Sequence, residues 1–92
     1  MEWVQSYPED WQMPISSPNS KDPALLSFGA AVRVARIVKG ISQEELANQC
    51  GVDRSYLGAI ERGEQNSGLL HLVRIATALE TTVGELMTKA GL

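Results

Sequence analysis

The sequence has a single cysteine, no long apolar run and no excess of basic residues. One cysteine, Cys50, cannot form a disulfide within the chain, and it falls at an apolar position of a predicted helix, so we interpret it as a small buried side chain. No apolar run approaches the roughly 18 residues of a membrane span. The first residues show neither the basic start nor the apolar stretch of a secretion signal, and we therefore expect a cytoplasmic protein.

Features typical of an enzyme are also missing. The only histidine, His71, lies between apolar residues of a predicted helix, without an acidic or cysteine partner at the spacing of a catalytic or metal site. We interpret it as a surface or partly buried side chain. The sequence contains no glycine-rich phosphate-binding loop. We therefore expect no catalytic activity, no metal and no cofactor.

Proline and charge divide the chain into two parts. All four prolines lie within the first 23 residues. Residues 1–24 carry one lysine and four acidic side chains, a net charge of −3, whereas residues 25–92 carry seven basic and seven acidic side chains. We predict an N-terminal arm over residues 1–24 and one domain over residues 25–92. A neutral domain has little non-specific attraction for phosphates, so any binding to nucleic acid depends on a few well-placed contacts.

The arm contains three of the five aromatic residues of the chain: Trp3, Tyr7 and Trp11. Its prolines and serines favour an extended, poorly ordered segment. Two interpretations remain open: the arm is a solvated tail with incidental aromatics, or it covers an apolar patch of the domain or reaches a partner subunit. The candidate patch lies on the first predicted helix, outside its core-facing stripe, and consists of Val34, Ile37 and Val38.

Residues 42–63 contain the end signals of two short helices. Ser42, followed by Glu45 three residues later, forms a capping box, and Gly51 ends the first helix. Asp53 caps the second helix, which ends at Gly63. About three residues separate the helices, too few for antiparallel packing, so we expect the axes to cross steeply. This arrangement is a helix-turn-helix, which presents its second helix to DNA.

Apolar residues at helical spacing predict three more helices. Residues 25–39 place Phe28, Val32 and Ala35 toward the core and stop at Gly40. No segment alternates as a strand does, so we predict an all-α fold, a compact five-helix bundle.

The other two helices lie near the end of the chain. One is predicted over residues 68–80 with Ser67 as its cap, and its inward residues are Leu69, Leu72, Ile75, Ala76 and Leu79. The last helix begins at Thr82, which with Glu85 repeats the capping box. Its core-facing residues are Val83, Leu86 and Met87.

Residues 28–87 resemble the Cro/C1-type (Xre-like) helix-turn-helix family, and within it the controller proteins of restriction-modification systems. The matching stretches are GISQEELANQCGV, DRSYLGAIERGEQN and LLHLVRIATALE, about two-thirds of the chain. The resemblance implies a five-helix bundle of the lambda-repressor-like DNA-binding type, here with an extended N-terminal arm.

The family also implies a set of residues that contact double-stranded DNA: Gln43, Arg54, Ser55, Tyr56, Ala59, Arg62, Gln65 and Asn66. Gln43 would bind a phosphate from the N-terminus of its helix. Arg54 and Ser55 would reach base edges in the major groove. Tyr56 would contact a phosphate or a base, and Ala59 a thymine methyl. Arg62, Gln65 and Asn66, in the loop after the second helix of the motif, would hold the DNA backbone.

Two further positions are structural by the same resemblance. Arg36 and Glu61 match an arginine and a glutamate that form an ion pair between the first and third helices of the family.

The sequence also departs from the family pattern. Glu80 stands where a glycine is common, and a left-handed conformation there would cost roughly 1 kcal/mol. Gly58 lowers helix propensity inside the second helix of the motif. We expect it to allow a close approach to DNA or to the first helix of the motif, which follows Ser42.

These observations predict a transcriptional regulator that binds a near-palindromic operator as a homodimer through the major groove. The alternative is an antitoxin or another helix-turn-helix module whose main partner is a protein such as a toxin. Two dimer surfaces are open. The first is the last helix with Leu86, Met87, Ala90 and Leu92, and the second is the aromatic arm with the apolar patch on the first helix.

Overall fold

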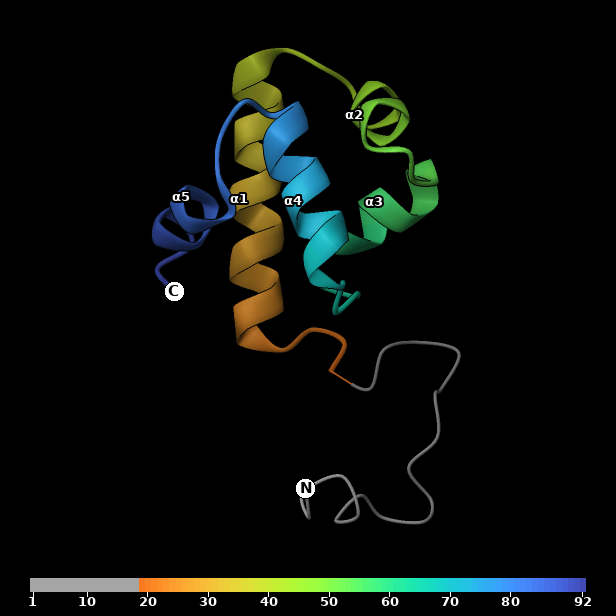
Figure 1. Cartoon of the computed structure of the whole chain (residues 1–92). Helices are drawn as coiled ribbons and strands as arrows, with labels where there is room; N and C mark the ends of the chain where they lie inside the picture. The colour runs from red at the N-terminus through yellow and green to blue at the C-terminus, as the bar shows by residue number, and fades with distance from the viewer. Residues whose placement is uncertain (1–18) are drawn as a thin grey trace, which may run out of the picture.

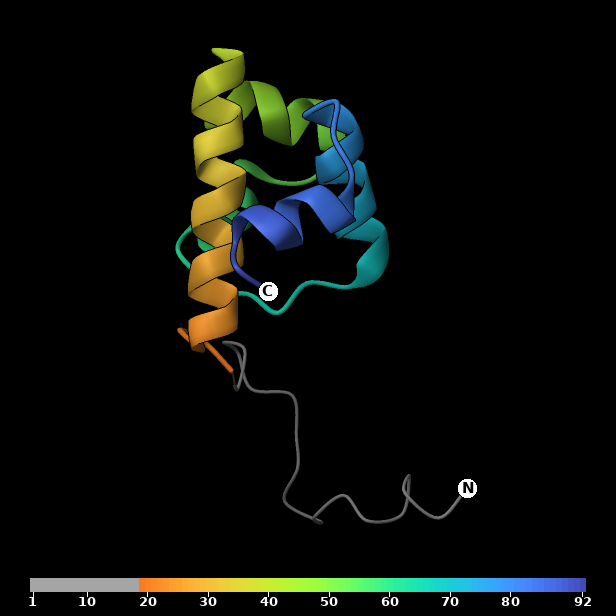
Figure 2. The ribbon, with the colours of Figure 1, turned by 90° about the vertical axis from the view of Figure 1, so that its left-hand side faces the viewer.

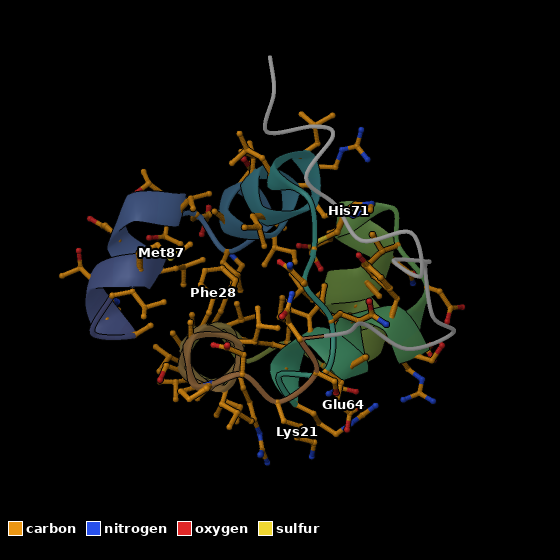
Figure 3. The ribbon with its side chains drawn as sticks, turned by 90° about the horizontal axis from the view of Figure 1, so that it is seen from below. Lys21, Phe28, Glu64, His71 and Met87 are labelled. Atoms are coloured by element: carbon orange, nitrogen blue, oxygen red, sulfur yellow. The ribbon has the colours of Figure 1, made fainter. Side chains whose placement is uncertain are left out.

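The computed structural model describes residues 19–92, which form five α-helices and no strand, as an all-α fold requires. The helices are α1 (Pro23–Lys39), α2 (Gln43–Cys50), α3 (Arg54–Glu61), α4 (Leu69–Ala78) and α5 (Val83–Lys89). Figure 1 shows α5 on one side of α1 and α4, and α2 with α3 on the other side. Seen from below, α1 and α4 lie across the core from each other (Figure 3). No described helix has the length and apolar character needed to cross a membrane.

The core is built from one stripe of each helix. The side chains that are almost completely inaccessible are Val32, Leu46, Leu57, Ile75 and Leu86. The α1 and α3 backbones come unusually close at Gly29, where an added Cβ would lie 2.3 Å from the carbonyl oxygen of Ile60. A side chain larger than hydrogen therefore does not fit at this crossing.

The predicted ends of α2 and α3 are confirmed. The Glu45 amide donates to Ser42 Oγ at 3.0 Å, and the Ser42 amide donates back to Glu45 Oε1 at 2.9 Å. This second bond is the main reason that the pKa of the Glu45 carboxyl lies below its usual value. Gly51 ends α2 in the left-handed conformation, with φ of 72°. Asp53 accepts the Ser55 amide at 3.1 Å and caps α3.

α1 begins two residues earlier than the sequence predicts. Asp22 accepts the Ala24 amide at 2.9 Å, and Pro23 occupies the first turn, where its missing N–H costs nothing. Just before this cap, the Lys21 amide donates to the Gly63 carbonyl at 2.6 Å. Residues of the predicted arm that lie next to α1 are therefore attached to the loop after α3. Residues 1–18, with the three aromatics of the arm, lie outside the described residues.

Two predictions for α4 are wrong. Ser67 is not the cap, because Gly68 occupies that position and has no side chain to offer, while Ser67 Oγ accepts a hydrogen bond from the Tyr56 hydroxyl at 3.0 Å. Leu69 is not inward-facing, because it is 67% exposed. Helical spacing gives the phase of an apolar stripe, but at this first turn none of residues 19–92 covers the leucine.

Of the capping box predicted for Thr82 and Glu85 at the start of α5, one of the two hydrogen bonds is present. Thr82 Oγ1 accepts the Glu85 amide at 3.0 Å, whereas the Glu85 carboxylate accepts the Thr81 hydroxyl at 2.6 Å and does not return to Thr82. In the corner before it, Glu80 adopts the left-handed conformation, with φ of 59°. Lys39 Nζ lies 2.5 Å from Glu80 Oε1, so the strained residue also makes an ion pair.

A buried ion pair holds α1 against α3. Arg36 Nε donates to Glu61 Oε2 at 2.7 Å and Arg36 Nη2 donates to Glu61 Oε1 at 3.2 Å. The third nitrogen of the guanidinium donates to the Ile41 carbonyl at 3.0 Å. The Arg36 and Glu61 side chains are only 12% and 2% exposed. Both charges are therefore withdrawn from water and depend on each other.

Replacing Arg36 by alanine removes the only cation that touches the Glu61 carboxylate within residues 19–92. We expect Arg36→Ala to lower the free energy of unfolding by about 3–5 kcal/mol, because a buried carboxylate loses its counter-charge. Urea unfolding followed by circular dichroism measures the change. Arg74→Ala, at an exposed arginine of α4, is the matched control and should change stability by less than about 0.5 kcal/mol. Equal effects of the two substitutions would contradict a structural role for the pair.

Candidate nucleic-acid interface

The two helices of the motif cross steeply. Figure 1 shows α2 nearly end-on and α3 from the side, with the short turn of residues 51–53 between them. α2 packs against both α3 and α4, so it braces α3 from behind. No other helix of the described part of the chain covers the outer face of α3. The structure therefore presents one helix of the pair and supports it with the other.

The side chains of α3 separate by face. Leu57, Ile60 and Glu61 are buried, whereas Arg54 and Ser55 at the start of the helix are exposed. The other predicted contacts are distributed as follows: Arg62 and Asn66 are exposed, and Gln43, Tyr56, Ala59 and Gln65 are partly buried. The presented face is thus polar and begins with an arginine.

Ser55 contributes to the cap of its own helix. Its hydroxyl donates a short hydrogen bond to Asp53 Oδ2, which also accepts the Ser55 amide. These two bonds, the hydroxyl first, hold the pKa of the Asp53 carboxyl below its usual value. The neighbouring Arg54 makes no hydrogen bond or ion pair within the described part of the chain, so its guanidinium donors are available to a ligand.

Gln43 is tied to the buried ion pair. Its Nε2 donates to Glu61 Oε1 at 2.9 Å. The Glu61 carboxylate of α3 therefore accepts hydrogen bonds from two other helices, α1 and α2. A glutamine amide has two N–H donors, and this bond fixes the direction of the second. Gln43 is therefore a donor held in a set orientation at the N-terminus of α2.

Gly58 makes room for side chains that cross the outer surface of α3. A Cβ at this position would lie 3.0 Å from Arg62 Nη1 and 3.4 Å from Gln43 Oε1. Arg62 and Gln43 therefore lie over the glycine. The close approach predicted at this glycine is made by an arginine after α3 as well as by a side chain of α2.

Glu64 accepts from Arg62 Nε at 3.2 Å and lies 3.6 Å from Lys21 Nζ (Figure 3). The hydrogen bond from Arg62 is the largest cause that holds the pKa of the Glu64 carboxyl below its usual value. Two cations thus share one carboxylate next to the end of α3. Arg62 is therefore already paired with a carboxylate, in contrast to Arg54.

The hydroxyl of Tyr56 points toward α4. It donates to Ser67 Oγ at 3.0 Å and lies 3.4 Å from His71 Nδ1, and the two rings meet edge to face with centroids 5.3 Å apart. Figure 3 shows His71 on α4. Tyr56 therefore connects α3 to α4 through the intervening loop.

Residues 19–92 contain no group of three metal-ligating side chains. Cys50 is buried at 4% exposure, and burial raises the pKa of its thiol.

Sequence reasoning missed three contacts of the site: Gln43 with Glu61, Arg62 with Glu64, and Tyr56 with Ser67. The contacts of Gln43 and Tyr56 join residues 18 and 11 positions apart, so no local pattern in the sequence predicts them.

Comparisons with known proteins agree with this geometry. Residues 32–86 match a family model described as helix-turn-helix (HTH_3). The control protein C.SmaI of Serratia marcescens is 44% identical over 61 residues, which cover 66% of this chain and 73% of that protein. A hypothetical transcription factor of Neisseria meningitidis is 40% identical over 76 residues, 82% of this chain and 70% of that protein.

A solved structure adds the fold. The restriction-modification controller protein C.AhdI from Aeromonas hydrophila superimposes with a TM-score of 0.66 at 47% identity, covering 67% of this chain and 94% of that chain. The chain belongs to the Cro/C1-type helix-turn-helix family, a family of DNA-binding transcriptional regulators rather than of enzymes.

Proposed function

We propose that this regulator reads a near-palindromic operator as a homodimer, with α3 of each subunit in the major groove. The observation that carries the proposal is the division of α3 into a buried face and an exposed face that begins with Arg54. An α-helix fits the major groove, and its first residues reach the base edges. An exposed helix start with an arginine available for binding matches that geometry.

Arg54 is the proposed base-reading residue. A guanidinium donates two parallel hydrogen bonds to O6 and N7 of guanine, which is worth about 1–3 kcal/mol of discrimination against another base. Ser55 beside it supports the reading through its hydroxyl, which also completes the helix cap. Ala59, one turn along, has only a methyl group and suits contact with a thymine methyl.

The proposed phosphate contacts surround this face. Gln43 offers its second amide N–H while Glu61 holds the first. Arg62 lies beside it over Gly58, and Gln65 and Asn66 follow in the loop before α4. Tyr56 has a different part in the proposal. Because its hydroxyl is bonded to Ser67, it serves DNA binding by holding α3 on α4.

A dimer follows from the weakness of a single domain as a DNA ligand. α3 has eight residues and reaches few base pairs, and the neutral charge of residues 25–92 gives little general attraction to phosphates. Two domains on half-sites about 34–36 Å apart would double the specific contacts. Exposed apolar side chains at the start of α4 favour this surface for the dimer: Leu69, Leu70 and Val73. In the α5 candidate, Leu86 is only 1% exposed within the monomer, whereas Leu92 is 58% exposed.

The base-reading assignment is tested with Arg54→Ala on a preferred duplex and on mixed-sequence DNA. We expect preference to be lost at one base pair of each half-site, with affinity for the preferred duplex reduced by about 1–3 kcal/mol per site and non-specific binding nearly unchanged. Arg33→Ala, on the outer face of α1, is the control and should leave both affinities unchanged. A uniform loss across all sequences in fluorescence-anisotropy titrations would identify Arg54 as a phosphate contact and overturn the assignment.

Gly58→Ala separates helix stability from DNA binding. Alanine raises helix propensity by about 1 kcal/mol, but its Cβ would lie 3.0 Å from Arg62 Nη1, so the Arg62 side chain must shift from its position over the glycine. We expect unchanged or higher thermal stability together with weaker binding to every duplex.

Gly84→Ala on α5 is the matched control for that experiment, because the nearest atom to its Cβ would be Thr82 Oγ1 at 3.8 Å. It should gain stability without any change in binding. Wild-type affinity of the Gly58→Ala protein would contradict the proposed role of Arg62 as a phosphate contact.

A further inference from the structure

The carboxylate of Glu64, just after α3, holds two cations through its two oxygens. Glu64 Oε1 accepts from Arg62 Nε at 3.2 Å and lies 3.1 Å from Arg62 Nη2. Glu64 Oε2 lies 3.6 Å from Lys21 Nζ, and Figure 3 shows the labelled Lys21 and Glu64 side chains at the same edge of the molecule. Among the ion pairs within residues 19–92, these two are the only ones that share a residue.

Hydrogen bonds of the backbone place Lys21 and Glu64 at the end of α3. The Lys21 amide donates to the Gly63 carbonyl at 2.6 Å, and the Glu64 amide donates to the Ala59 carbonyl at 2.8 Å. Lys21 also adopts the left-handed conformation, with φ of 68°, which is uncommon for a residue with a side chain. The one lysine of residues 1–24 is therefore fixed beside the loop that carries the proposed phosphate contacts.

Glu64 occupies the part of Arg62 that a phosphate would use. The Nε and Nη2 edge of the guanidinium faces the carboxylate, whereas Nη1 lies over Gly58, 3.0 Å from the position of an added Cβ. Carboxylates and phosphates both accept paired hydrogen bonds from a guanidinium edge. A DNA phosphate that binds Arg62 through this edge must therefore displace Glu64.

We propose that Lys21 is a positioning residue for DNA binding, which releases Arg62 to a phosphate by holding Glu64. The inference rests on the proposed function, in which Arg62 is a phosphate contact. When a phosphate takes the edge of Arg62, Glu64 keeps Lys21 as its counter-charge, so the exchange leaves no unpaired carboxylate beside DNA. Without Lys21, Arg62 would be the only cation of Glu64 within residues 19–92, and the carboxylate would hold it more firmly.

The contacts are weak enough for DNA to reverse them. The Lys21 and Arg62 side chains are exposed and Glu64 is partly buried, and ion pairs at such positions contribute little to stability. The hydrogen bond from Arg62 lowers the pKa of the Glu64 carboxyl most, and the charge of Lys21 adds to the effect, so both cations act on the same group. From the usual strength of exposed pairs, we expect the exchange to change DNA affinity by about two- to fivefold per subunit.

A double-mutant cycle tests the proposal by fluorescence anisotropy on a mixed-sequence duplex at low salt, because a phosphate contact acts on every sequence. Lys21→Met removes the charge and keeps a long side chain, and it should lower affinity about two- to fivefold per subunit. Glu64→Gln frees Arg62 and should raise affinity by a similar factor. In protein that carries Glu64→Gln, adding Lys21→Met should change nothing, because Lys21 then has no carboxylate to hold.

Lys89→Met is the matched control, since it makes the same change of charge at an exposed lysine of α5. In Figure 2, α5 (blue) faces the viewer and α2 and α3 (green) lie behind it, so Lys89 is on the other side of the molecule from the proposed DNA-binding surface. The control should leave affinity unchanged, alone and together with Glu64→Gln. Circular dichroism and thermal unfolding show whether each variant is folded.

Three results would overturn the inference. Wild-type affinity of the Lys21→Met protein would remove its basis, and an equal loss with and without Glu64→Gln would mean that Lys21 contacts DNA directly. A gain from Glu64→Gln that persists in Arg62→Ala protein would come from general charge repulsion and not from the release of Arg62. Failure of the wild-type protein to bind any duplex would instead contradict the proposed function itself, so the two failures can be told apart.

Discussion

The buried carboxylate of Glu61 is the interaction on which the rest of the structure depends. It lies at the end of α3, accepts two hydrogen bonds from Arg36 of α1 and accepts one from Gln43 of α2. Three helices therefore meet at one charged group that is 2% exposed at its side chain. A carboxylate withdrawn from water to this extent requires its partners in place, so it fixes the relative positions of the helices as well as contributing to their stability.

This constraint connects folding to recognition. Arg36 satisfies the charge and also the Ile41 carbonyl, which stands at the turn between α1 and α2. Gln43 takes part in the same cluster and is one of the proposed phosphate contacts. The orientation of a donor on the proposed DNA-binding surface is thus set from inside the domain. Gly29 has a related effect on α1, because its missing side chain allows the backbone of α3 to approach closely enough for the ion pair to form.

Short-range features of the fold could be predicted from the sequence, because the two partners of a cap lie within three residues. Ser42 with Glu45 and the glycine at position 51 are examples. Ser67 shows where such reasoning fails. Its hydroxyl had an alternative partner, Tyr56, eleven residues earlier in the chain, and a local pattern contains no information about that contact. Leu69 fails for a similar reason, since spacing places a residue on a face but does not reveal whether another element covers it.

The exposed positions of the candidate site could be predicted from the sequence, but the hydrogen bonds between its side chains could not. The resemblance predicts a set of positions that contact DNA, and the exposure of Arg54 and Arg62 is compatible with that prediction. The resemblance does not predict the hydrogen bond from Gln43 to Glu61 or the one from Arg62 to Glu64, which orient two of the proposed contact residues. The hydrogen bond from the Tyr56 hydroxyl to Ser67, on which the proposed supporting role of Tyr56 rests, likewise has no signal in the sequence.

Selection of bound duplexes from a random pool by the full-length protein tests the central claim most directly, since it reports base preference, symmetry and spacing together. The account predicts enrichment of a near-palindrome whose half-sites are centred about one helical turn, or roughly 10 base pairs, apart. A pool that remains random at low salt, where electrostatic attraction to DNA is greatest, would contradict it.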